Sequence, residues 1–167
     1  MAYVDTNVII AYGFEDDPNH DKATSLVERY RGAGEFYGSP LTLVELYSSL
    51  HRNIQRYRLP QTIMQLSDER IKVKSIVQLL LRSLDIKIFP EDCTVESVDN
   101  FKIHRIFNEA VQLVHRIRLR TLDLLHVVYA KLLAERGLVR YFITLDSDII
   151  KRRREIHEVA GLNIVDS

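Results

Sequence analysis

The stretch YVDTNVII, residues 3–10, places a carboxylate directly after a short apolar run. The run from Ala2 to Val4 is typical of a strand, and Thr6 and Asn7 are residue types that often cap helices. A strand that ends in a charged residue and opens onto a helix is where open α/β sheets bind ligands. Asp5 is therefore the first candidate site residue, although one aspartate does not define a site.

The rest of the chain repeats this alternation of short strands and longer helices. Further strands are expected at EFYGSP (35–40), IKIF (86–89), YFIT (141–144) and LNIV (162–165). The YFIT run is densely apolar, which is typical of a strand buried on both faces. Because strands separated by helices require crossover connections, the sequence predicts a three-layer α/β/α sandwich with a mostly parallel sheet.

The helices are predicted from capping residues and from apolar periodicity. They are expected at His20–Arg31, after the N-cap Ser39 and Pro40, over 61–84 as one helix or two broken near SDE, from the cap Thr121 to Gly137, and in a last helix ending at Ala160. The strongest helical period joins seven apolar residues: Ile103, Ile106, Phe107, Ala110, Leu113, Val114 and Ile117.

Length and composition indicate one globular domain over 1–167, with a longer helical middle segment at about 55–105. The single cysteine, Cys93, excludes an internal disulfide and fits a reducing, cytoplasmic setting. The N-terminus has no signal-peptide pattern, and no stretch approaches the ~18 apolar residues of a membrane span, so no membrane association is expected.

The net charge of zero hides an uneven distribution. Of the 23 acidic and 23 basic residues, the first 50 positions hold eight acids and three bases, which leaves 15 acids and 20 bases in the remainder. Lys and Arg neutralise phosphates, so the basic remainder is compatible with an anionic polymer as ligand.

Four carboxylates occupy equivalent places in the predicted fold. Asp5 and Asp146 each follow a strand, Asp123 lies in the first turn of its helix, and Glu45 lies in the second turn of the helix opened by Ser39. In a parallel sheet these places share one edge, so the four side chains are expected to converge. Two carboxylates ~5 Å apart repel by about 3 kcal/mol at an effective dielectric of ~20, a cost that a divalent cation removes.

The donor set indicates which cation. Oxygen ligands without a matched histidine pair suit Mg²⁺ or Mn²⁺ rather than zinc. One or two such ions activate a water and neutralise the leaving oxygen of a phosphodiester, so the sequence predicts a metal-dependent phosphoryl-transfer site.

Each carboxylate also has a purely structural explanation. Asp123 can complement a helix dipole, and Asp5 and Asp146 can cap helices. Glu45 can be solvated on a polar helix face that it shares with three residues: Ser48, Ser49 and Arg52. Their joint placement is what favours a functional interpretation.

Residues near the four carboxylates are candidates for supporting roles. Asp148 is a candidate outer metal ligand, and Thr144 can support Asp146 through its hydroxyl. His126 lies one turn after Asp123 and has no partner histidine, so a core or supporting role is favoured over metal ligation.

Four segments together resemble the motifs of PIN-domain nucleases, and more narrowly the VapC-like toxins of toxin-antitoxin pairs. They are VDTNVI around Asp5, LTLVELYSSL around Glu45, LDLLHVVYA around Asp123 and FITLDSDI around Asp146. The resemblance covers nearly the whole chain. It implies a compact α/β/α sandwich and a Mg²⁺- or Mn²⁺-dependent endoribonuclease whose acidic residues match these four, with Asn7 and Thr144 in supporting positions.

The chain departs from this pattern in its middle, because residues 55–105 are longer and more basic than the compact toxins usually show. The departure leaves substrate class and antitoxin pairing open. Two basic runs supply candidate RNA contacts near the acidic residues: Arg116, Arg118 and Arg120 in HRIRLR, and Lys151 and Arg152 in KRRR. Such runs are also common on solvated helix faces.

The leading hypothesis is an endoribonuclease, with RNA and an antitoxin protein as partners. A non-catalytic nucleic-acid-binding or scaffold protein on the same fold is the alternative, but it gives no reason for four clustered acids. A phosphatase with Asp5 as nucleophile is disfavoured because Asn7 stands where the haloacid-dehalogenase pattern has a second aspartate. The strongly apolar helices make a homodimer plausible.

Overall fold

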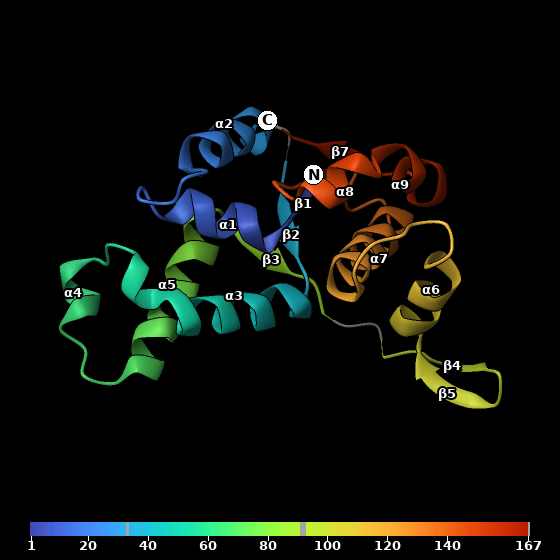
Figure 1. Cartoon of the computed structure of the whole chain (residues 1–167), viewed down its shortest axis with the longest axis horizontal. Coiled ribbons are helices and arrows are strands. Elements are labelled where there is room, and N and C mark those ends of the chain that lie inside the picture. The colour runs from blue at the N-terminus through green and yellow to red at the C-terminus, as the bar shows by residue number, and fades with distance from the viewer. Residues whose placement is uncertain (33, 91–92, 167) are drawn as a thin grey trace.

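The computed structural model describes residues 1–32, 34–90 and 93–166. Its main sheet contains five parallel strands in the order β3-β2-β1-β6-β7 (Figure 1). The strands are β1 (Ala2–Val4), β2 (Phe36–Gly38), β3 (Ile86–Ile88), β6 (Tyr141–Ile143) and β7 (Asn163–Val165). Each strand expected from the sequence is present, and the predicted parallel sheet is confirmed.

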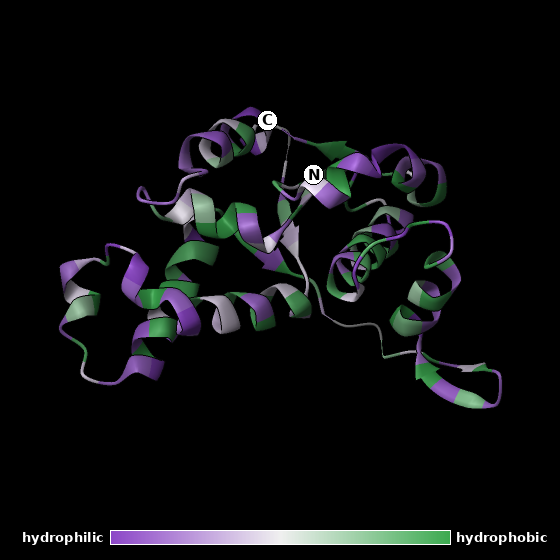
Figure 2. Ribbon diagram, in the orientation of Figure 1, coloured by the Kyte–Doolittle hydropathy of each residue, from purple (hydrophilic) through white to green (hydrophobic). Residues whose placement is uncertain are grey.

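Helices cover both faces of this sheet. One layer contains α1 (Thr6–Gly13), α2 (His20–Arg31), α3 (Pro40–Asn53) and α5 (Glu69–Ser83). The other layer contains α6 (Arg105–Leu113), α7 (Thr121–Glu135), α8 (Ser147–Lys151) and α9 (Arg153–Ala160). Helix α7 is apolar along most of its length because it is buried on several sides (Figure 2). The three-layer α/β/α prediction is therefore confirmed.

The two-residue period of the strands divides the core between the two layers. Val4 and Ile143 belong to the core cluster on the α1–α3 side, whereas Tyr3 and Phe142 belong to the cluster on the α7 side. All four are completely buried. Adjacent residues point to opposite faces, so this alternation needs apolar side chains at every position of the central strands.

The sheet has its topological switch point beside β1. From β1 the chain adds β2 and β3 on one side, while β6 and β7 lie on the other side. Open α/β sheets bind ligands outside the carboxyl ends of the strands at such a point. The ends of β1 and β6 carry Asp5 and, three residues after β6, Asp146.

The helix starts near this edge differ in part from expectation. Ser39 caps α3 in a capping box with Thr42, and Pro40 is the first helical residue, as predicted. Asp5 is the N-cap of α1, as its structural explanation proposed, because its carboxylate accepts the Thr6 N–H, whereas Thr6 and Asn7 are already helical.

The cap of α7 was also wrongly predicted. Its N-cap is Arg120, which makes no side-chain cap, and Thr121 is already the first helical residue. Gly137, just beyond the helix, has φ = 72°, in agreement with its predicted role as the terminating residue.

The middle of the chain holds the largest departures from the expected helices. The segment 61–84 forms two helices, α4 (Gln61–Met64) and α5, broken where the sequence reads SDE, and a 3₁₀ turn, η1, spans Ile54–Arg56. The helix expected from Ile103 begins instead at Arg105 and ends at Leu113. The last helix is likewise divided, into α8 and α9.

Ile103 belongs to an antiparallel hairpin of β4 (Val95–Val98) and β5 (Phe101–His104), which extends away from the main sheet (Figure 1). The chain reverses through Asp99 and Asn100, both at positive φ, as a two-residue hairpin turn requires. The middle segment is thus less helical than expected. The prediction of one domain over 1–167 stays a prediction, and Ser167 lies outside the described residues.

No helix within the described ranges is both long and apolar enough to cross a membrane.

Candidate active site

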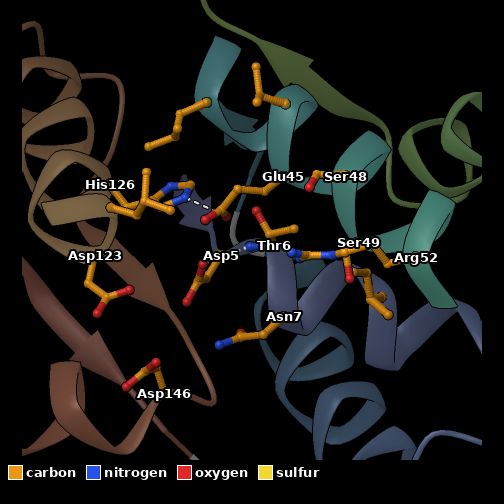
Figure 3. A pocket seen from close by; sticks show the side chains of 14 residues that line it. Asp5, Thr6, Asn7, Glu45, Ser48, Ser49, Arg52, Asp123, His126 and Asp146 are labelled. Atoms are coloured by element: carbon orange, nitrogen blue, oxygen red, sulfur yellow. Dashed lines mark hydrogen bonds and ion pairs between the residues drawn. The ribbon is translucent and has the colours of Figure 1, made fainter. Parts of the chain in front are cut away.

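A cleft of about 380 Å³ opens at the carboxyl ends of β1 and β6, between α3 and α7 (Figure 3). Asp5, Glu45, Asp123 and Asp146 all line it. The other lining residues are Thr6, Asn7, Ile10, Leu41, Val44, Ser48, Ser49, Arg52, Leu122 and His126. The structure therefore brings together the four carboxylates that the sequence placed at one sheet edge.

Asp5 lies at the buried end of the cleft, with 6% of its surface exposed. Its Oδ1 accepts the Thr6 N–H at 2.8 Å, and its Oδ2 accepts the Thr144 hydroxyl at 2.7 Å. Burial raises the pKa of Asp5, while the nearby His126 charge and the Thr144 hydrogen bond oppose that rise. Both oxygens of this carboxylate are thus fixed by protein donors.

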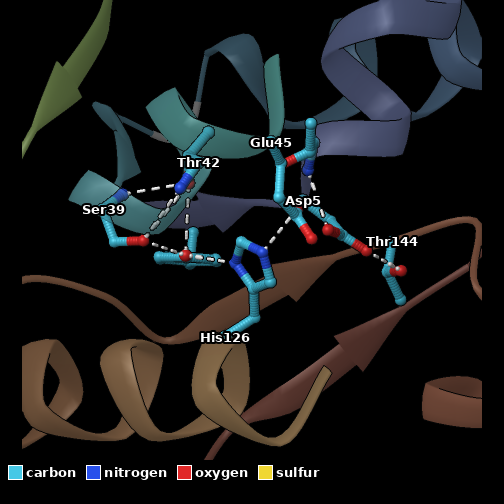
Figure 4. Close-up of polar contacts among 8 residues, drawn as sticks. Asp5, Ser39, Thr42, Glu45, His126 and Thr144 are labelled. Atoms are coloured by element: carbon cyan, nitrogen blue, oxygen red, sulfur yellow. Dashed lines mark hydrogen bonds and ion pairs between the residues drawn. The ribbon is translucent and has the colours of Figure 1, made fainter. Parts of the chain in front are cut away.

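Glu45 is oriented by a buried hydrogen-bond chain that starts at His126 (Figure 4). His126 Nε2 donates to Glu45 Oε2 at 2.7 Å, and His126 Nδ1 lies 2.6 Å from the Tyr3 hydroxyl. That hydroxyl lies 2.8 Å from Ser39 Oγ and 3.3 Å from Thr42 Oγ1. The capping box of α3 is therefore joined to the acidic cleft through Tyr3 and His126.

In this hydrogen-bond chain, the charges of His126 and Glu45 stabilise each other. Burial would lower the pKa of His126, but its hydrogen bond to Glu45 and the charges of Asp5, Glu45 and Asp123 raise it overall. Burial would raise the pKa of Glu45, but the hydrogen bond and charge of His126 lower it overall. The expected supporting position of His126 agrees with this geometry, since both ring nitrogens have protein partners.

One oxygen or nitrogen each from Asp5, Glu45 and His126 lies within 4.8 Å of the other two. Such a group has the spacing of a metal site, although the His126 nitrogens are engaged by Glu45 and Tyr3. The carboxylate oxygens are therefore the better ligand candidates, and they are the donors that hard divalent cations prefer.

Asp146 is the N-cap of α8, and its Oδ1 accepts the Asp148 N–H at 2.7 Å and the Ile149 N–H at 3.4 Å. The Asp146 N–H donates to Thr144 Oγ1 at 2.9 Å. The same Thr144 hydroxyl thus contacts both Asp5 and Asp146. Asp5 and Asp146 therefore both cap helices and line the cleft. The two explanations are compatible, because an N-cap residue at this edge of the sheet also faces the crevice.

Asp123 differs from the other three carboxylates. It is half-buried, and it accepts no hydrogen bond from another residue in the described part of the chain. Burial, together with the negative charges of Asp146 and Asp5, raises its pKa to about 6. Its charge is therefore the least compensated of the four.

Thr6 supplies a feature that its expected capping role did not anticipate. Its hydroxyl is buried and has no hydrogen-bond partner within the described residues, although it lies close enough to Glu45 to lower the pKa of that carboxyl. In Figure 3 it lies beside Glu45, facing the cleft. Buried hydroxyls are nearly always partnered, so a ligand or an ordered water is expected to complete this one.

The two outer candidates Asn7 and Asp148 contribute differently. Asn7 lines the cleft, and its Oδ1 accepts the Leu145 N–H at 3.3 Å. Asp148 is exposed, lies outside the cleft and pairs with Lys151 at 3.1 Å. Its place as an outer metal ligand stays a prediction.

None of the basic residues proposed to contact RNA lines the cleft. They are Arg116, Arg118, Arg120, Lys151 and Arg152. Lys151 pairs with Asp148, and Arg152 pairs with Glu155 at 3.2 Å. Arg120 lies near enough to Asp148 to contribute, after Lys151, to lowering its pKa.

Arg52 is the one Lys or Arg that lines the cleft within the described ranges. The sequence placed it on the polar helix face of Glu45, seven residues further along, and gave solvation as one explanation of that face. The spacing was the available signal, because residues seven apart lie on the same side of a helix.

Comparison with known proteins supports the fold. Among solved structures, the chain is similar to VapBC2 from Rickettsia felis bound to a DNA fragment from its promoter, with 17% identity, a TM-score of 0.58, and coverage of 99% of this chain and 98% of that chain. It is also similar to Mycobacterium tuberculosis VapC20, described as a sarcin-ricin loop cleaving toxin, with 15% identity, a TM-score of 0.53, and coverage of 90% and 94%.

A comparison with curated proteins found no match. The family model described as PIN domain matches residues 2–156. That range includes all four carboxylates of the cleft, together with Asn7, His126 and Thr144. This chain belongs to the PIN domain family.

Proposed function

We propose that this protein is a Mg²⁺- or Mn²⁺-dependent endoribonuclease that hydrolyses RNA phosphodiester bonds in the acidic cleft. The observation that supports it most is the meeting of four carboxylates from distant parts of a PIN-domain chain at the switch point of the sheet. Without a cation their mutual repulsion is uncompensated at Asp123.

The residues present fit a hard divalent cation. Oxygen donors from Asp5, Glu45, Asp123 and Asp146 face one space, and the unpartnered Thr6 hydroxyl lies beside them. When bound, such an ion supplies a water of lowered pKa and neutralises charge on the leaving oxygen.

The protein's own residues fix the carboxylates that would bind the ion. His126 orients Glu45, the Thr144 hydroxyl donates to Asp5, and the Asp146 carboxylate accepts the N–H groups at the start of α8. Because His126 and Thr144 are buried, the carboxylates that they contact need little rearrangement when a ligand arrives, which is the preorganisation that catalysis requires.

We further propose that the protein is the toxin of a toxin-antitoxin pair, with RNA as substrate and a small antitoxin protein as partner. The similarity to VapBC2 and VapC20 supports this assignment through the shared fold. Five basic residues are proposed to attract the RNA backbone: Arg116, Arg118, Arg120, Lys151 and Arg152. A homodimer and a cytoplasmic location stay predictions.

Single substitutions of the carboxylates test the enzymatic proposal. D5N, E45Q, D123N and D146N should each yield folded protein with RNA cleavage in Mg²⁺ or Mn²⁺ reduced at least about 100-fold, because each removes an ionic oxygen ligand. Exposed Asp21, in the first turn of α2, provides the matched control D21N, which should cleave like the wild type.

Two results would reject the nuclease proposal. One is cleavage by the wild type that persists in EDTA. The other is a wild type that binds RNA but leaves it intact in either metal, which would instead support the non-catalytic alternative.

A further inference from the structure

We propose that one face of α3, formed by Ser48, Ser49 and Arg52, is a binding subsite for an RNA phosphate next to the one that is cleaved. This subsite, called here the α3 subsite, rests on the proposed nuclease function. It extends that function by defining the substrate as a strand of several nucleotides.

The α3 subsite is continuous with the acidic centre. Glu45, Ser48, Ser49 and Arg52 follow one another at spacings of three, one and three residues, and all four line the cleft. Figure 3 shows Arg52 extending from α3 toward the middle of the cleft, on the side away from Asp123 and Asp146. Helix geometry places the Cα atom of Arg52 about 10.5 Å along the helix axis from the Cα atom of Glu45.

The guanidinium of Arg52 has no anionic partner in the described structure, which favours an anionic ligand. Its guanidinium makes no hydrogen bond or ion pair with any other described residue, whereas Arg152, Arg153 and Arg154 all pair with carboxylates. It is also the one Lys or Arg in the lining among the residues described. A guanidinium offers a planar fork of donors that matches two phosphate oxygens, and the Ser48 and Ser49 hydroxyls can add further donors.

A neighbouring groove, whose lining includes Asp17 and Asp148, adjoins the cleft beside the α3 subsite. This groove, of about 460 Å³, shares Asn7, Ile10, Ser49 and Asp146 with the acidic cleft. The two hollows therefore join beside the α3 subsite, which leaves room for nucleotides beyond the acidic centre.

The positions of Glu45 and Arg52 on α3 indicate which phosphate is bound. Arg52 lies about two helical turns beyond Glu45, so its side chain enters the cleft from a different place than the metal-ligand candidates. The guanidinium is thus matched to a flanking phosphate rather than to the one at the metal ligands. A dinucleoside monophosphate has one phosphate and cannot use both places.

Binding and cleavage of chains of different length test the α3 subsite. The variants are R52Q, R52K and the matched control R56Q; Arg56 is exposed, lies outside the cleft and undergoes the same change of charge. The probes are an oligodeoxythymidylate pentamer for binding by fluorescence anisotropy, and a pentaribonucleotide and a dinucleoside monophosphate for cleavage in Mn²⁺.

R52Q should weaken pentamer binding about tenfold, the loss expected for one charge-assisted contact. It should also reduce the slope of log K against log[salt] by about 0.7, the value for one phosphate on a single strand. R52K should recover part of the affinity, and R56Q should stay within about twofold of the wild type. The KM penalty of R52Q should be several times larger for the pentaribonucleotide than for the dinucleotide.

The outcomes separate this inference from the function on which it rests. If the wild type cleaves RNA but R52Q and R56Q bind the pentamer equally well, the α3 subsite is wrong and the nuclease proposal stands. Equal KM penalties on both chain lengths would also overturn the subsite. If R52Q alone loses pentamer affinity and salt dependence while the wild type cleaves no RNA, phosphate binding stands and the nuclease proposal falls.

Discussion

The β1–α3 side of the cleft and the α7 side treat their carboxylates in different ways. On the first side, Asp5 and Glu45 accept hydrogen bonds from Thr6, Thr144 and His126, all of them buried partners. On the second side, Asp123 accepts none from the described residues, and its pKa is raised to about 6.

This difference shows which negative charges the folded protein compensates by itself. Asp5 and Glu45 are compensated by protein dipoles and by the His126 charge, so their geometry is expected to persist without a metal. Asp123 is left to repel its neighbours until a ligand arrives. Substitutions on the two sides should therefore change the stability of the metal-free protein in opposite directions.

The largest expected effect comes from removing the partner of Glu45. H126A should lower the free energy of unfolding by about 3 kcal/mol, because it removes the donor to the half-buried Glu45 carboxylate, removes one of the three partners of the buried Tyr3 hydroxyl and leaves a cavity. Urea unfolding at pH 7 in EDTA measures this loss.

His51 provides the matched control for that experiment. It is exposed and lies 3.6 Å from the equally exposed Glu69, so H51A should change stability by less than about 0.5 kcal/mol. An H126A protein as stable as H51A would show that the buried chain does not stabilise the β1–α3 side.

A smaller effect is expected where the two sides meet. The Thr144 hydroxyl donates to Asp5 and accepts the Asp146 N–H in a completely buried position. T144V keeps the shape of the side chain but leaves both groups without this partner, and it should cost about 2 kcal/mol. T144S keeps the hydroxyl, so it should retain more stability than T144V in the same urea unfolding experiment; the reverse order would indicate that Thr144 acts through packing alone.

The fold could be predicted from the sequence to a large extent because its signals are local. Strands such as YFIT are short apolar runs, and Ser39 with Pro40 marks a helix start in any context. The β4–β5 hairpin was missed because Ile103 continues the helical period of α6 by coincidence. The alternating VESV and FKIH segments around Asp99 and Asn100 carried the hairpin signal.

In the candidate site too, some features could be predicted from the sequence and others could not. The meeting of Asp5, Glu45, Asp123 and Asp146 follows from chain topology, so position in the sequence was enough to place all four at one edge. The contact from His126 through Tyr3 to Ser39 joins residues more than 80 positions apart. Such a contact depends on how α7 packs against the sheet, and no local sequence pattern predicts this packing. The same holds for Arg52, whose place in the lining depends on the tilt of α3.

The smallest effect, and the one of opposite sign, is expected at Asp123. D123N should raise the unfolding free energy of the metal-free protein by about 1 kcal/mol at pH 7.5, because it removes a half-buried charge that repels Asp146 and Asp5. Exposed Asp148 pairs with Lys151, so the control D148N should bring no such gain.

The pH dependence and the metal dependence of this gain distinguish charge repulsion from a generic stabilisation. The folded pKa of Asp123, about 6, lies above its ordinary value of 3.8, so ionisation costs the folded state stability that is present below pH 4 and lost as pH rises through 6. The advantage of D123N should therefore vanish near pH 4 and be complete above pH 7. Excess Mn²⁺ should reverse the order at pH 7.5, since the wild type binds the ion more tightly and gains more stability from it. A gain that is independent of pH and unaffected by Mn²⁺ would mean that the α7 side is not electrostatically strained, and the contrast between the two sides would be lost.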